Sequence, residues 1–161
     1  MRKIRIIIST LLFCSLAGYS QSLIRYAFTD FPSKNWKSAS LMYVAGFADG
    51  HAELLSHHYY KFERTFPNAN AQFWNPELSW VNKYKNNDPN QGPKYFGSTN
   101  VFVLATDGYH ACKFVQKSAI VAALVIKIGE KKKFKFYIVD AVMYLVTYTL
   151  GFYTSYSWMY R

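Results

Sequence analysis

Eleven consecutive residues, ADGHAELLSHH, hold two of the chain's nine acidic residues and three of its four histidines. An α-helix brings residues four apart to the same side. Asp49, Glu53 and His57, spaced i, i+4 and i+8, would therefore form one stripe of ionisable side chains. His51 and His58, seven residues apart, would share a different side of the same helix.

A second group, TDGYH, repeats these residue types further along the chain. On a helix Asp107 and His110, at i and i+3, face together, and Lys117 continues their stripe. Carboxylates and imidazoles on facing helices are the ligands with which helical bundles hold Zn, Mn or Fe ions. One hypothesis is therefore a divalent-metal site with the ligands Asp49, Glu53, His57, Asp107 and His110.

Such a site would suit a membrane-embedded metal-dependent hydrolase. A bound metal lowers the pKa of its water, which then attacks an ester or a phosphoester. The catalytic candidates are Glu53 and Lys117, and Lys113 or Lys117 would hold a phosphate, such as that of a lipid headgroup. The spacing matches no metal motif of fixed form, such as H-E-x-x-H.

Two other interpretations fit the same residues. In a polar seam or a wet helix face, acidic groups pair with histidine, or Asp140 pairs with a lysine, without any metal. In the second interpretation, the ionisable groups form a proton or ion path, and they are retained because they carry out that function. Ionisable side chains cost about 2.5–3.5 kcal/mol each at the centre of a membrane segment and are retained there mainly for function. The residues alone leave the three interpretations open.

The composition indicates one folded domain. The 161 residues are 51% hydrophobic and 19% aromatic, which is enough for a packed core. The net charge of +10 comes from basic residues scattered along the chain, apart from KIGEKKKFK at 127–135. A cytoplasmic loop explains that cluster as well as a nucleic-acid site would, so we expect no nucleic-acid partner.

The N-terminus predicts a signal peptide at 1–20. MRKIRIIISTLLFCSLAGYSQS has a basic start, an apolar stretch and small residues before a cleavage point between Ser20 and Gln21. An uncleaved signal anchor is the alternative. Cleavage would leave a single helical domain, 21–161, with Cys112 as its only cysteine and no internal disulfide. Cys112 fits a packed thiol better than a nucleophile.

Hydrophobic patterning predicts an all-α fold with three long helices. The first covers about 35–62 and ends before Phe66–Pro67. The second covers about 99–128, with Gly129 just beyond it. The third covers about 134–158.

The third helix is the clearest membrane candidate. From 136 to 158 it carries one charge, Asp140, and about 20 apolar residues suffice to cross a bilayer. A core helix of a soluble protein is the alternative. With the basic 127–135 loop in the cytoplasm, the second and third helices would form a two-span hairpin in the inner membrane. Residues 21–110 would then lie on the periplasmic side, and the helix at 35–62, with both ends outside, would not span.

Residues 63–98 form a long external loop in this prediction. The stretch from 66 to 98 holds four of the five prolines and seven aromatic residues. Within it, NPELSWVNKY predicts a short helix capped by Asn75, with Pro76 in its first turn and Trp80 and Tyr84 on one face. The aromatic side chains would anchor the loop on membrane lipids or on another envelope protein.

The run FWNPELSWVNKYKNNDP, followed by GSTNVFVLATDGYH, resembles small bacterial envelope proteins for which no activity is known. The resemblance covers roughly 43–112 and transfers no cofactor or residue role. The sequence thus predicts a small envelope membrane protein with a structural or accessory role. In it the Asp/Glu/His cluster fixes helix packing or binds an ion. The metal-dependent hydrolase is the alternative.

Overall fold

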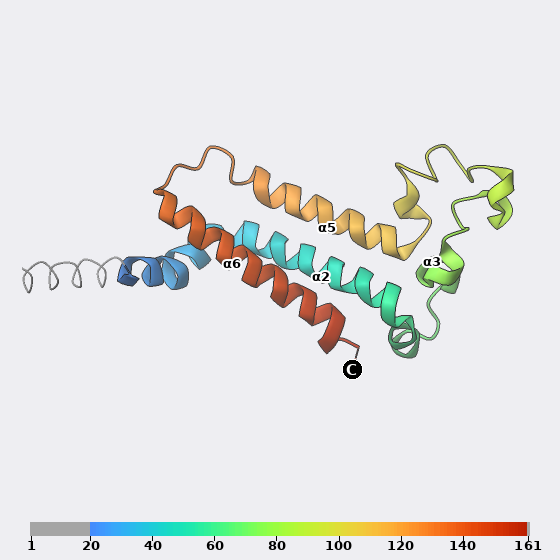
Figure 1. Cartoon of the computed structure of the whole chain (residues 1–161), viewed down its shortest axis with the longest axis horizontal. Coiled ribbons are helices and arrows are strands. Elements are labelled where there is room, and N and C mark those ends of the chain that lie inside the picture. The colour runs from blue at the N-terminus through green and yellow to red at the C-terminus, as the bar shows by residue number, and fades with distance from the viewer. Residues whose placement is uncertain (1–19, 161) are drawn as a thin grey trace, which may run out of the picture.

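The computed structural model describes residues 20–160. All the secondary-structure elements in that range are helices. The all-α prediction is therefore confirmed for this part of the chain. Three long helices dominate Figure 1: α2 (Phe31–Thr65), α5 (Gly108–Val125) and α6 (Phe134–Tyr153). The predicted signal peptide lies outside the described residues except for Ser20, which is already helical.

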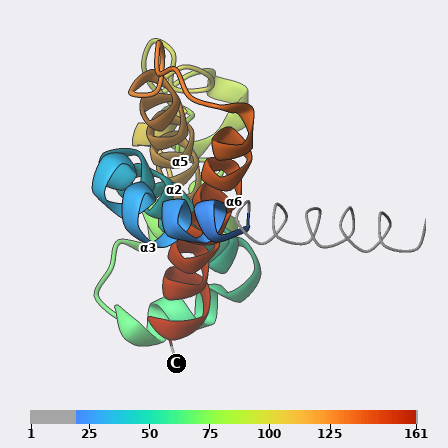
Figure 2. The same ribbon diagram turned by 90° about the vertical axis from the view of Figure 1, so that its left-hand side faces the viewer.

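The helix α2 is the centre of the fold, because α5 and α6 each pack along it. Figure 1 shows α2 between the other two helices, and Figure 2 shows the same arrangement turned by 90°. α2 and α6 run parallel: the ring of Tyr26, just before α2, lies 4.4 Å from that of Phe136, measured between ring centres, and Tyr43 donates a hydrogen bond to Thr154 at 3.0 Å. α5 runs antiparallel to α2, since Lys127 contacts Asn35 near the start of α2.

Glycines allow α2 and α6 to approach closely. A Cβ atom at Gly46 would overlap the backbone carbonyl of Tyr148, and one at Gly50 would overlap that of Phe152. On the opposite side of the contact, a Cβ at Gly151 would overlap a carbonyl of α2. The sequence GFADG in α2 is thus a G-x-x-x-G pair, the pattern with which membrane helices approach one another.

The predicted two-span hairpin is not confirmed. Among the described residues only one helix, Phe134–Trp158, is long and apolar enough to cross a membrane, with a mean hydropathy of 1.3. The helix α5 is shorter than predicted and carries Lys113 and Lys117. It begins at Gly108 rather than near 99, because the preceding residues form turns and a 3-10 helix, η4 (Val103–Ala105).

The placement of α2 also differs from the prediction for 35–62. Its N-terminus lies beside the basic loop before α6, and its C-terminus lies beside the end of the chain. The two ends of α2 are therefore at opposite ends of α6. If α6 crosses a bilayer, this packing does not allow both ends of α2 to lie outside.

Helix boundaries follow local chemistry. Residues 20–25 and the π-helical η1 (Tyr26–Asp30) lead directly into α2, so helical structure begins well before residue 35, the predicted start. Pro32 lies at the junction of η1 and α2. α2 ends at Thr65, before Phe66–Pro67 as predicted. α5 ends at Val125 rather than near 128, and turns lead from it to Gly129, whose φ is +84°. α6 continues through the π-helical η5 (Thr154–Trp158) to the predicted residue 158.

The connection from α2 to α5 is ordered by short elements. It contains α3 (Ala71–Trp74), α4 (Pro76–Ser79), and three 3-10 turns, η2 (Lys85–Asn87), η3 (Pro89–Gln91) and the η4 named above. The Asn75 side chain caps α4 by accepting from the backbone N–H of Glu77 at 3.0 Å, as predicted. α4 ends at Ser79, however, so Trp80 and Tyr84 share no helical face. The Trp74 ring lies against Gly108 and fixes the connection to the start of α5.

Candidate functional site

The ionisable stripe of α2 meets a lysine of α5. The ammonium of Lys113 lies 2.6 Å from Oδ1 of Asp49 and 2.8 Å from Oε1 of Glu53. The spacing of four residues places both carboxylates on one side of α2, as predicted, and α5 brings one cation between them. This ion-pair triad joins α2 to α5.

The triad extends to α6 through hydrogen bonds. The Tyr148 hydroxyl donates to Oδ2 of Asp49 at 2.6 Å, and Nε2 of Gln116 donates to the Tyr148 oxygen at 2.8 Å. At the outer end, Nε2 of His57 lies 3.4 Å from Glu53. One polar seam therefore crosses all three long helices, and we define it by Asp49, Glu53, Lys113, Gln116 and Tyr148.

A second polar cluster surrounds the one acid of α6. Asp140 is buried, forms an ion pair with Lys132, and accepts hydrogen bonds from Tyr26 at 2.9 Å and Asn35 at 3.3 Å. Glu130 lies 3.2 Å from the same lysine. The expected pairing of Asp140 with a lysine is thus confirmed, and a buried carboxylate with these partners needs no metal to stabilise it.

The predicted pair Asp107 and His110 lies at the start of α5, where Asp107 caps the helix. The carboxylate of Asp107 accepts a hydrogen bond from the backbone N–H of His110 at 2.8 Å and contacts Nδ1 of the same histidine at 2.8 Å. This is N-cap geometry, which satisfies donors that the first helical turn leaves without partners. Within residues 20–160, no hydrogen bond or ion pair links these two residues to Asp49 or Glu53.

The five predicted metal ligands do not converge on one point. Asp49, Glu53 and His57 lie along α2, whereas the other two form the cap of α5. Across the described part of the chain, no group of three or more His, Cys, Asp or Glu side chains is placed to hold a metal ion. The Lys113 ammonium already takes the position between the two carboxylates. Lys117, a catalytic candidate, is exposed.

His51 and His58 face a different side of α2, as their spacing predicts. Their rings pack on Tyr160 and Tyr156, with ring centres 5.6 and 5.7 Å apart. Burial lowers the pKa of His51 below its usual value, so this imidazole is neutral at pH 7. Burial also raises the pKa of Tyr160, whose hydroxyl lies 2.8 Å from Nδ1 of His51.

The sequence interpretation missed two features of the site. The pair Gly46 and Gly50 is readable in the sequence as G-x-x-x-G, and it sets the α2–α6 contact that brings Tyr148 to Asp49. Gln116 carries no such signal, because its role depends on how α5 and α6 are placed around α2.

In comparisons with known proteins, no protein-family model, curated protein or solved structure matches this chain significantly.

Proposed function

We propose that this chain is a membrane protein of the bacterial envelope with a structural or accessory role. In this proposal α6 crosses the bilayer, and the polar seam fixes α5 and α6 against α2. The observation that carries the proposal is the uncovered apolar surface of α6.

Large apolar side chains cover the surface of α6 that faces away from α2. Leu145 is 65% exposed and Val142 54%, and only 11% of the most apolar 18-residue window is buried. A core helix of a soluble protein would be covered by its neighbours, whereas contiguous apolar surface of this kind marks contact with lipid or with another protein. The helix α5 also carries exposed apolar side chains, including Leu124 and Val125.

The polar seam supports a packing role rather than catalysis. Each carboxylate of the triad has a positive partner, and Tyr148 is paired on both sides. Removing one member of such a set leaves an uncompensated charge, so the set specifies how the helices dock. No second function is proposed, because Lys113 holds the two carboxylates that a hydrolytic metal would need.

The connection between α2 and α5 supports a partner at that end of the molecule. Phe96 is 94% exposed and Trp80 53%, while Trp74 holds the connection on α5. Exposed aromatic side chains on an ordered scaffold are typical of protein interfaces and of membrane–water boundaries. We propose membrane lipids or a second envelope protein as the partner of this aromatic loop.

The test is retention in the membrane after alkaline extraction. Cells expressing the full chain are fractionated, and the pellet is washed with sodium carbonate at high pH. We expect the native chain to stay in the pellet and Leu145→Asp to be released, because a charge in the apolar face of α6 opposes insertion. The matched control is Leu78→Asp, which changes an exposed leucine of α4. Release of the native chain would refute the proposal.

A further inference from the structure

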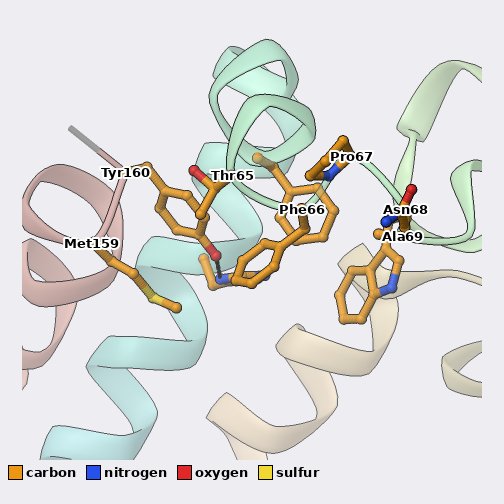
Figure 3. Close-up of a pocket in the computed structure, with 10 residues that line it drawn as sticks. Thr65, Phe66, Pro67, Asn68, Ala69, Met159 and Tyr160 are labelled. Atoms are coloured by element: carbon orange, nitrogen blue, oxygen red, sulfur yellow. Dashed lines mark hydrogen bonds between the residues drawn. The ribbon is translucent and has the colours of Figure 1, made fainter.

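An aromatic cavity lies at the end of the molecule where α2 and the C-terminal segment meet (Figure 3). Its volume is about 590 Å³, within the range of about 300–1,000 Å³ that small-molecule sites occupy. Its main walls are His51, Phe62, Phe66, Trp74, Met159 and Tyr160. None of the residues of the polar seam lines it, so the cavity is a separate feature of the fold.

The walls are fixed by contacts between rings from different segments. Phe62 of α2 lies 5.3 Å from Trp74 of α3 and 6.2 Å from Tyr160, measured between ring centres. Phe66 approaches Tyr160 at 6.1 Å. Rings held in this way offer preformed faces for stacking or edge contacts with a planar ligand.

The polar residues Thr65 and Asn68 also line the cavity, and one hydrogen-bonded pair lies among its aromatic walls. The Tyr160 hydroxyl, on a residue that is only 1% exposed, lies 2.8 Å from Nδ1 of His51. If the hydroxyl donates to Nδ1, its hydrogen is satisfied and the neutral imidazole carries its proton on Nε2. The opposite assignment would leave a buried hydroxyl hydrogen without an acceptor, which proteins rarely tolerate. The pair thus makes His51 a hydrogen-bond donor through Nε2–H.

The charge of the lining excludes most ligand classes. Among residues 20–160, no Asp, Glu, Lys or Arg side chain lines the cavity. Among these lining residues an anionic ligand would find no cation, and a quaternary ammonium would have aromatic faces but no carboxylate. An uncharged ligand with a flat ring fits both the walls and the donor that His51 offers.

We propose that this cavity binds an uncharged planar ring bearing a carbonyl, of the quinone class, whose oxygen accepts a hydrogen bond from Nε2–H of His51. The ring would lie among Phe62, Phe66 and Trp74. The assignment rests on the cavity and its polar pair and does not depend on whether α6 crosses a membrane.

The test measures how tightly two ligands of the same shape bind to two forms of the protein. Duroquinone and durene share a tetramethyl six-membered ring, and only duroquinone has carbonyls. Binding to the purified full chain in detergent is measured by equilibrium dialysis. We expect saturable 1:1 binding of duroquinone, roughly tenfold tighter than that of durene, as one good hydrogen bond allows. His51→Phe keeps a ring but loses the donor, so it should bind both ligands equally.

Further variants keep the result interpretable if His51→Phe folds poorly. Tyr160→Phe retains all the rings and removes only the hydroxyl that sets the tautomer, so it should reduce the preference for duroquinone over durene. Trp80→Phe, at an exposed tryptophan outside the cavity, should leave both affinities unchanged. Equal affinity of the native chain for the two ligands, or displacement of duroquinone by tetramethylammonium, would overturn the proposal.

Discussion

Gly46 of α2 lies directly against the backbone carbonyl of Tyr148 in α6, with no room for a side-chain carbon between them. The contact aligns two parallel helices and places the Tyr148 hydroxyl 2.6 Å from Asp49, one helical turn along from Gly46. The close packing of α2 with α6 and the polar seam are therefore parts of one arrangement. Changing either should disturb the other.

Gly46→Ala should destabilise the protein. The added methyl would overlap backbone atoms of α6, which cannot rotate away as a side chain can, and overpacking of this kind costs about 1–3 kcal/mol. The expected result is a lower melting temperature in detergent, followed by circular dichroism. Ser40→Ala, at an exposed position of α2, is the control. Equal melting temperatures for the two variants would show that the helices are not in close contact at this glycine.

Lys113→Met should destabilise the protein more than Lys117→Met. It leaves Asp49 and Glu53 without their shared cation, and groups that lose a buried partner cost about 1–3 kcal/mol each. The lower part of that range is expected, since the three side chains retain 16–31% exposure. The free energy of unfolding in urea measures the effect.

A charge-neutral form of the triad separates packing from catalysis. Asp49→Asn and Glu53→Gln, combined with Lys113→Met, should recover most of the stability lost by Lys113→Met alone, because no unpaired charge remains. If the triple variant were less stable than the single one, the carboxylates would have a role beyond pairing with Lys113.

Stability should fall as the pH drops below about 6.5, the ordinary pKa of histidine. Burial lowers the pKa of His51 in the folded chain, so below that pH the unfolded state binds more protons. The loss continues until the pH passes the folded pKa, at up to about 1.4 kcal/mol per pH unit. Melting temperatures of the native chain and of His51→Phe, measured from pH 7.5 to 5, should diverge at the acidic end. Parallel curves would contradict this.

Asp107→Ala should lower stability by about 0.5–2 kcal/mol, the usual cost of losing an N-cap. Asp107→Asn should keep most of that stability, since asparagine caps as well as aspartate does. A metal ligand would behave differently, because the amide would lose the charge that a metal prefers. Retained stability in Asp107→Asn therefore supports the capping role, and thermal unfolding of both variants measures it.

Local chemistry made several features of the fold predictable. The first long helix ended before Phe66–Pro67 as expected, Asn75 capped a short helix, and the spacing of Asp49 and Glu53 placed both on one face. Each of these depends on residues within a turn or two of one another. The periodicity of a helix therefore identifies which side chains share a face, but not which residues of another helix pack against that face.

Features that depend on how the helices dock were not predictable. Lys113 is the partner of the α2 carboxylates only because α5 returns antiparallel after a 42-residue connection, Phe66 to Asp107. The apolar run VFVLA before Asp107 favoured an early start for α5, but the Asp107 cap begins the helix at Gly108. The parallel course of α2 and α6 follows from two reversals of the chain, which the helix pattern alone does not predict.

The central claim is that α6 crosses a bilayer with its two ends on opposite sides. Single cysteines at the exposed positions Lys131 and Glu77 test it, in a chain whose native Cys14 and Cys112 are changed to serine. Intact cells or spheroplasts are treated with a membrane-impermeant maleimide before and after permeabilisation. We predict that one cysteine is labelled at once and the other only after permeabilisation. Equal labelling of both in intact cells would contradict the claim.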